Sequence, residues 1–199
     1  MKKSTPTDRI HIMGSPTKKV LVIILTLAAS VAAICIALHL AREDRSDLLG
    51  AEFRDPELKI TFRLPAKWRT AEPPPKVRDL FSKTGRRLVA YFKGPGQGDS
   101  CSLVTVASEK KLFGVRAEIL RSERSLKKKE LQDDFNSFNG VPAWINQYGI
   151  GDPPFVLRNT RVIFDRGDTK VMLLFSLTAK SMRQQEEAIG ESVGTVTLD

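Results

Sequence analysis

The sequence predicts an α+β fold in which one transmembrane helix precedes a single domain with a mainly antiparallel sheet and packed helices. Three observations lead to this prediction: an uncharged apolar run over residues 20–41, alternating apolar patterns after it, and two stretches with helical spacing among and after those patterns. Runs of strands with a few helices inserted are typical of α+β domains. The part that follows the apolar run, about 150 residues, has the usual size of one domain.

Residues 20–41 are predicted to form a transmembrane signal anchor. As a helix they rise about 33 Å, which matches a hydrocarbon core about 30 Å thick, and they are apolar on every side. A helix in the core of a small domain would keep one polar face. A cleaved secretory signal is the closer alternative, but this run is longer than a signal's usual apolar stretch, and its end lacks a good pair of small residues for cleavage.

Flanking charge predicts the orientation of this anchor. Residues 1–19 carry five basic side chains and one acidic side chain, whereas "AREDRSD" after the run carries more acids than bases. Because Lys and Arg favour the cytoplasmic side, we expect a disordered cytoplasmic tail over 1–19, a linker over 42–52 and an extracytoplasmic domain over 53–199. The expected location is the inner or plasma membrane of a bacterial envelope, crossed once.

The first strands are predicted from alternation. "LKITFRL" places apolar residues on one face over 58–64, and Trp68 follows as a candidate core residue. "RLVAYFK" (87–93) and "CSLVTVAS" (101–108) are expected to pair as a hairpin around the loop "GPGQGD" (94–99).

The prolines of "AEPPPKV" (71–77) predict an extended connection between those strands, because proline donates no backbone hydrogen bond. Helical spacing then predicts a helix over about 115–131. An Asn-Gly turn introduces a strand near 142–150. Two further strands, 155–164 and 169–179, are expected to pair around "DRGD", and "SMRQQEEAIGESVGTV" closes the chain as a helix.

Three of these stretches resemble the PsbP-like family of accessory and envelope domains. They are "LKITFRLPAKW", "GVPAWINQ" and the closing "RVIFDRGDTKVMLLFSLTAKSMRQQEEAIGESV", which together cover much of 58–193. The resemblance implies an antiparallel sheet with helices packed on it, used as a binding or assembly module. It brings no catalytic residues and no cofactor.

The residue types of the exported domain restrict its chemistry. Both histidines lie before residue 42, which argues against His-based catalytic dyads and His-based metal sites in the domain. Cys35 lies in the apolar run and Cys101 in the exported domain, so no disulfide is expected, and Cys101 is interpreted as a buried strand residue. "GPGQGDS" lacks the ending of a phosphate-binding loop, and the "RGD" of 166–168 is interpreted as a turn.

Charged residues supply the remaining candidates. Asp133 with Asp134, and Asp165 with Asp168, are acidic pairs that we interpret as solvated surface. A basic helix is the more interesting candidate, since it offers contact with anionic lipid or another polyanion. No aromatic residues are interleaved with its cations, which argues against nucleic acid as the partner. The candidate contact residues are Arg116, Arg121, Arg124, Lys127, Lys128 and Lys129.

The function predicted from the sequence is a membrane-anchored, extracytoplasmic binding or assembly module without catalytic activity, acting with a protein partner. Two alternatives remain open: an envelope enzyme that uses carboxylates or an oxygen-bound metal, and electrostatic docking to anionic surfaces through 116–129. A cleft with converging acids would favour the enzyme, and a groove without them would favour the binding module.

Overall fold

The computed structural model describes residues 47–152 and 156–198, which belong to one compact unit. The predicted tail and anchor, 1–19 and 20–41, lie outside the described residues. Within the described part of the chain, every helix is too short or too polar to traverse a bilayer. The elements in chain order are β1 (Leu49–Asp55), β2 (Ile60–Pro65), β3 (Arg69–Thr70), α2 (Pro75–Lys83), β4 (Arg87–Lys93), β5 (Ser100–Ala107), α3 (Leu112–Ser122), β6 (Lys128–Phe138), β7 (Val141–Ile150), β8 (Leu157–Arg166), β9 (Thr169–Thr178), α4 (Ala179–Gly194) and β10 (Thr197–Leu198).

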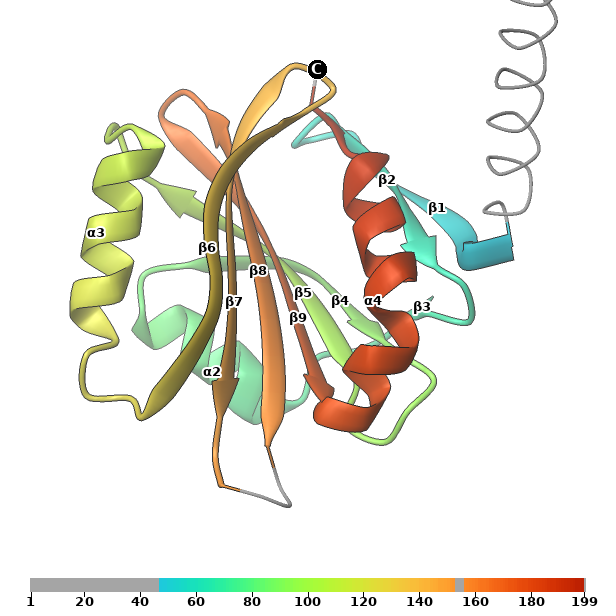
Figure 1. Cartoon of the computed structure of the whole chain (residues 1–199). Coiled ribbons are helices and arrows are strands. Elements are labelled where there is room, and N and C mark those ends of the chain that lie inside the picture. The colour runs from blue at the N-terminus through green and yellow to red at the C-terminus, as the bar shows by residue number, and fades with distance from the viewer. Residues whose placement is uncertain (1–46, 153–155, 199) are drawn as a thin grey trace, which may run out of the picture. The chain divides into compact units, whose positions relative to one another are not determined.

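A seven-stranded sheet in the order β3-β4-β5-β9-β8-β7-β6 forms the centre of the domain, and all its pairings are antiparallel. A second sheet, β1-β2-β10, is also antiparallel. Helices α2 and α3 lie on one face of the large sheet, whereas α4 and the small sheet lie on the other (Figure 1). The α+β class and the antiparallel sheet predicted from the sequence are therefore confirmed.

Two apolar layers hold these elements together, one on each face of the large sheet. On the α4 face, Trp68, Phe164 and Phe175 pack with α4 side chains such as Ile189. On the other face, Trp144 packs beneath α2 and α3 with a set made of Phe81, Val104, Leu112, Val115, Ile119, Ile163 and Met172. Side chains alternate between the faces of a strand, so each central strand contributes to both layers.

Local signals account for the hairpin turns. The Asn139–Gly140 turn joins β6 to β7 with φ of 50° and 81°, which are the positive values that this type of turn requires. In the loop after β4, the Asp99 carboxylate accepts hydrogen bonds of 2.9 Å from the Gly96 N–H and from Gln185 of α4. Cys101 follows in β5 and is completely buried, as predicted.

Three predictions about the elements were wrong. A helix was predicted over 115–131, but helix α3 ends at Ser122. Residues 128–131 of that predicted helix are instead the start of strand β6. The predicted extended connection over 71–77 holds only as far as Pro74, because Pro75 occupies the first turn of α2, where a missing N–H costs nothing. Strand β1 begins at Leu49, inside the predicted 42–52 linker.

Candidate functional site

A buried polar cluster beneath the C-terminal end of α3 is the main candidate site. We call Glu123, Lys128, Tyr148 and Arg161 the Arg161 cluster. Arg161 comes from the middle of β8 and has only 2% of its surface exposed. It lies opposite Asn146 of β7 and on the same sheet face as Ile163, so the strand alternation directs a guanidinium into the layer covered by α3.

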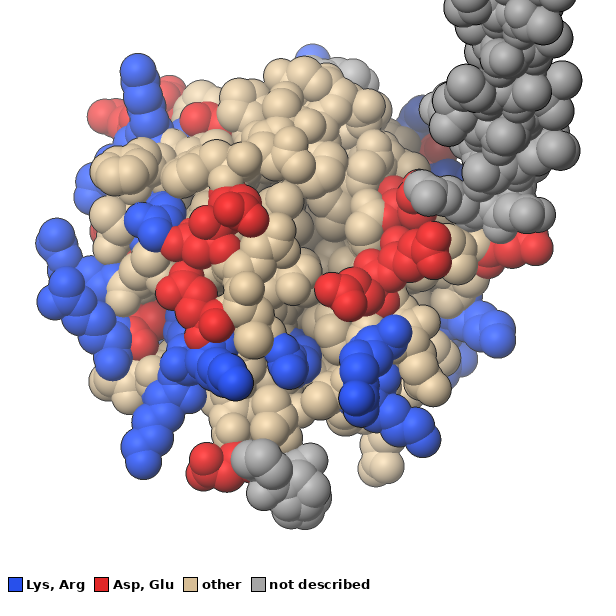
Figure 2. All heavy atoms as spheres, in the orientation of Figure 1, with Lys and Arg blue, Asp and Glu red and all other residues tan. Residues whose placement is uncertain are grey.

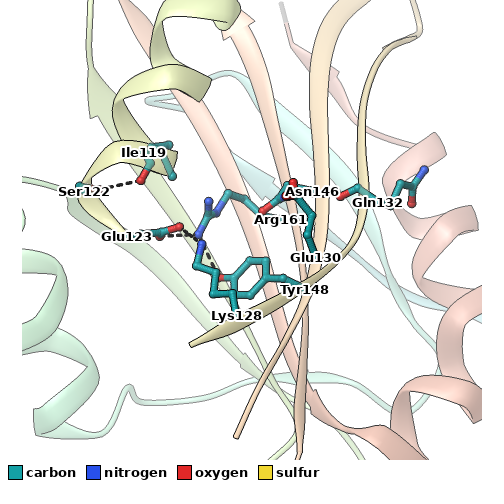
Figure 3. Close-up of polar contacts among 9 residues, drawn as sticks. All are labelled: Ile119, Ser122, Glu123, Lys128, Glu130, Gln132, Asn146, Tyr148 and Arg161. Atoms are coloured by element: carbon teal, nitrogen blue, oxygen red, sulfur yellow. Dashed lines mark hydrogen bonds and ion pairs between the residues drawn. The ribbon is translucent and has the colours of Figure 1, made fainter. Parts of the chain in front are cut away.

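Hydrogen bonds connect the cluster to three elements and to the end of α3 (Figure 3). Arg161 Nη2 donates to Glu123 Oε1 at 2.7 Å and to the Tyr148 hydroxyl at 2.9 Å. Lys128 Nζ donates to the other oxygen of Glu123 and lies 4.2 Å from the centre of the Tyr148 ring. The cluster therefore fixes the turn between α3 and β6 to the sheet.

The charges of the cluster shift the pKa values of its members. Burial raises the pKa of Glu123, but Arg161 and Lys128 act more strongly in sum and hold it below its ordinary value. Burial raises the pKa of Tyr148, and the charge of Arg161 opposes that effect. The carboxylate is therefore ionised at neutral pH, and the tyrosine is a neutral hydrogen-bond partner.

The structure separates the six basic residues that the sequence placed on one helix. Arg116 and Arg121 are on α3, whereas Lys128 and Lys129 are on β6. Arg116 donates to Asp133 with a bond of 2.9 Å from Nε, and Lys128 belongs to the Arg161 cluster, so both charges are compensated within the domain. The exposed members of the predicted set are Arg121, Arg124, Lys127 and Lys129.

The two acidic pairs do not converge on a common point. Asp133 and Asp134 lie on β6, not at a helix end, and as successive strand residues they point to opposite faces. Asp133 also accepts a hydrogen bond of 2.7 Å from the Trp144 indole. Asp165 pairs at 2.9 Å with the buried Lys170 across the "DRGD" turn. Asp133 and Asp165 therefore stabilise the fold locally.

A groove lies between α4 and strands β6–β8, and we call it the α4 groove. It consists of two hollows of about 250 and 220 Å³ that share Gln147, Thr160, Met182 and Glu186. Figure 2 shows the surface hollowed along this side of α4, with acidic side chains on both flanks. The remaining lining residues are Leu131, Gln132, Phe138, Ile145, Arg158, Asn159, Val162, Ala179, Arg183, Ile189, Gly190 and Val193.

The lining of the α4 groove changes along its length. One end carries the guanidinium groups of Arg158 and Arg183, and the rest is mostly apolar, with side-chain amides from β6 and β7. Glu186 is the single carboxylate among its lining residues. Glycosidase-type catalysis places two carboxylates on either side of the scissile bond, and this lining supplies one carboxylate. The groove therefore offers apolar contact along most of its length, side-chain amides for hydrogen bonds, and two guanidinium groups at one end.

Comparisons with known proteins agree with this fold. No protein-family profile matches the sequence, and no curated protein matches it. Among solved structures, cyanobacterial PsbP (CyanoP) from Synechocystis sp. PCC 6803 is similar with a TM-score of 0.56 and 10% identity, over 77% of this chain and 94% of that one. LpqN of Mycobacterium tuberculosis, described as involved in cell envelope biogenesis, is similar with a TM-score of 0.50 and 10% identity, over 77% and 93%. The described domain therefore has the PsbP-like fold, as the sequence resemblance suggested.

Sequence reasoning did not find the Arg161 cluster. One signal was present: Asn159 and Arg161 share a strand face with Ile163, and a charged residue in the middle of such a strand indicates a buried polar contact. The partner of that charge was hidden, because Glu123 was assigned to the interior of a helix. Glu123 lies over the sheet, within reach of Arg161, because helix α3 ends one residue earlier, at Ser122.

Proposed function

We propose that this protein is a non-catalytic binding or assembly module of the bacterial envelope, held at the membrane by residues 20–41 with its domain outside the cytoplasm. The α4 groove is the observation that carries this proposal. Similarity in fold to CyanoP and LpqN supports it, since one is a PsbP protein and the other is described as involved in envelope biogenesis. The anchor and its orientation rest on the length of the apolar run and on its flanking charges.

The lining of the groove favours an extended segment of a partner protein as the occupant. Apolar side chains such as Ile145 and Val162 offer surface for alternate side chains of that segment, and Gln132 and Gln147 offer hydrogen bonds to its backbone. At the other end, Arg158 and Arg183 complement an acidic side chain or a terminal carboxylate. The proposed ligand is therefore an apolar segment that ends in an acidic group.

The four grooves described on the domain favour this function over a carboxylate enzyme. Two of them form the α4 groove, in which Glu186 is the one lining carboxylate. The third groove has Glu118 as its one lining carboxylate, and the fourth has Asp55. None of these four brings two carboxylates together within the described part of the chain. The cleft with converging acids that the enzyme alternative requires is not among them.

Site-directed photo-crosslinking in native membranes tests the proposal. A photoreactive residue at Gln147 is expected to give a discrete product with an envelope protein. Gly190 lines the groove and has open space around its Cα, so Gly190→Trp should fill the groove and abolish the product, whereas Gly190→Ala should preserve it. Arg158→Glu should weaken the product. If Gly190→Trp and Gly190→Ala gave the same amount of crosslinked product, at equal amounts of folded protein, the α4 groove would not be the partner-binding site.

A second candidate function is docking to anionic lipid through Arg121, Arg124, Lys127 and Lys129. These four side chains are exposed and lie close in the sequence at the end of α3 and the start of β6. Each cation near an anionic surface contributes about 1 kcal/mol, so four form an effective patch. The acids and bases elsewhere on the visible face are mixed (Figure 2).

Liposome binding separates this candidate from the first. Changing the four residues to Gln should remove salt-dependent binding to vesicles rich in phosphatidylglycerol. The matched control changes four other exposed cations, Arg69, Lys76, Lys83 and Lys93, and alters net charge equally. Equal loss in both variants would show an effect of net charge alone and would eliminate the patch.

A further inference from the structure

Strand β6 forms a free edge of the large sheet. β7 is its one neighbour in the sheet, and among the described residues no strand pairs with its outer side. The helices also leave this edge uncovered, because α3 packs mainly on β7 and β8, and α4 on β2, β8 and β9. In Figure 1, β6 runs between the two helices and neither crosses it. An unpaired edge of this kind is a template for pairing with another strand.

The regular part of this edge runs from Gln132 to Phe138. A bulge precedes it, where the register shifts between Glu130 and Gln132, and Lys128 and Lys129 lie before the bulge. Bulges and lysines are features that block pairing at a sheet edge. From Gln132 onward every residue faces its β7 partner in unbroken register. This stretch is therefore the part of β6 that is able to accept a second strand.

The hairpin turn decides which backbone groups of β6 face outward. Phe138 and Val141 flank the two-residue turn between β6 and β7, and a turn of this type joins its flanking residues by a backbone hydrogen bond. Such pairs alternate along an antiparallel ladder, so Ser137 and every second residue before it direct N–H and C=O away from β7. In agreement, the Ser137 N–H donates to the Asn136 side chain at 2.8 Å. The outward-facing residues of the stretch are Asp133, Phe135 and Ser137.

An exposed aromatic pair lies at the centre of this stretch. Phe135 of β6 is 50% exposed, and Phe113 of α3 is 68% exposed. Their rings stack with centroids 6.4 Å apart, on the sheet face that α3 covers. Burial of apolar surface is favourable, so a strand that pairs with β6 gains stability if it also covers these two rings.

We infer that the partner of this edge is β6 of a second copy of the chain, paired antiparallel about a two-fold axis at Phe135. This register aligns the whole stretch from Gln132 to Phe138 with itself. It also places outward-facing residues opposite one another, as a hydrogen-bonded ladder requires: Phe135 opposite its own copy, and Asp133 opposite Ser137. A contact of this kind is self-complementary and closes as a dimer.

The charges of the stretch favour this register over its neighbours. Asp134 lies opposite Asn136, whose amide is a donor for the carboxylate, and Asp133 lies opposite the hydroxyl of Ser137. Registers centred on Asp133 or Asp134 would put identical carboxylates directly opposite each other, which is destabilising. A register centred on Asn136 would shorten the overlap. With the axis at Phe135, the aromatic pairs of both copies meet in one apolar cluster.

This contact is separate from the α4 groove, and the inference goes beyond the proposed function without resting on it. Phe135 lies on the sheet face that α3 covers and does not line the groove. A two-fold axis through paired edge strands runs perpendicular to the sheet. The two α4 grooves of the dimer would therefore open on the same face of one continuous sheet.

Disulfide formation between two differently tagged full-length copies in native membranes tests the register. One copy carries Asp134→Cys and the other Asn136→Cys, both with Cys35→Ser. Facing residues of a non-hydrogen-bonded pair have Cα atoms about 4.5 Å apart, within the range of a disulfide, so oxidation should join the two copies. Each variant alone is the control. Its two cysteines would lie diagonally, about 7–8 Å apart, and the product should be lost.

A charge at the axis should break the contact. Phe135→Glu, added to both cysteine copies, puts like charges directly opposite and should abolish the disulfide product. The matched control is Leu80→Glu, which changes an apolar side chain of α2 that is 58% exposed and should keep the product. Wild-type protein in detergent should sediment as a dimer.

Several results would overturn the inference. They are a monomeric wild-type protein, no product from the mixed copies, equal product from either variant alone, or product retained with Phe135→Glu. A disulfide of either cysteine with a different protein would assign the edge to a foreign strand and would also overturn it. Phe135→Glu should leave photo-crosslinking at Gln147 unchanged, so failure of this inference is distinguishable from failure of the proposed function.

Discussion

Arg161 of β8 and Glu123 at the end of α3 are joined by a hydrogen-bonded ion pair of 2.7 Å, although 38 residues separate them in the sequence. The arginine side chain is 2% exposed and the glutamate side chain 15% exposed. This pair holds the turn between α3 and β6 on the sheet.

Removal of the Glu123 charge should strongly destabilise the domain. Glu123→Gln leaves the Lys128 and Arg161 cations buried without compensation, and breaking a buried pair in this way costs about 3–5 kcal/mol. Urea unfolding measures the change. Glu57→Gln breaks an exposed pair with Arg87 and should cost less than about 1 kcal/mol. Similar small losses in both variants would contradict the structural importance of the buried pair.

Stability should fall at acid pH because two carboxylates have depressed pKa values. For Asp133, the hydrogen bond from Arg116 lowers the pKa most, and for Glu123 the nearby cations outweigh burial. A depressed folded-state pKa contributes stability that is complete above the unfolded value, about 4 for both types, and is lost as pH falls through the folded value. Urea midpoints between pH 3 and 7 should show this loss. The double variant Glu123→Gln, Asp133→Asn should show a smaller pH dependence, and an unchanged slope would contradict the prediction.

Substitution of Gly96 should destabilise the loop that closes on α4. An added Cβ would lie 2.3 Å from the Asp99 carboxylate and 2.7 Å from the Ser181 hydroxyl, so the loop must shift. We expect Gly96→Ala to lower the free energy of unfolding by about 1–3 kcal/mol. Gly190→Ala, in open space on α4, should instead raise it by about 0.5–1 kcal/mol. A loss of stability at Gly190 or a gain at Gly96 would contradict the packing of these segments.

Cys101 should be unreactive while the domain is folded. Its thiol is completely buried in β5, and burial raises its pKa well above the ordinary value. In a Cys35→Ser background, a thiol reagent should label Cys101 only as the protein unfolds in urea, and Cys101→Ser should remove the signal. Rapid labelling in native buffer would show that the thiol is accessible.

Central strands that are buried on both faces were predicted well, and the exposed edge strand β6 was not. β5, β8 and β9 carry apolar residues on buried faces, which is why their extents agree closely with the sequence. β6 is an edge strand with no fully buried residue, so its composition resembles that of a solvated helix. Its pairing with β7 decides its structure, and a sequence pattern does not contain that long-range contact.

The sequence by itself determined the class of the domain, the hairpin turns at Asn139–Gly140 and Gly167, and the burial of Cys101, because these follow from local chain geometry and from hydrophobic periodicity. Only the tertiary structure decided that Glu123 meets Arg161, that Arg116 pairs with Asp133, and that the α4 groove remains open. Those features depend on which strand faces which helix. The register of an antiparallel sheet sets that arrangement across many residues, and a one-residue change in register would turn Arg161 to the opposite face.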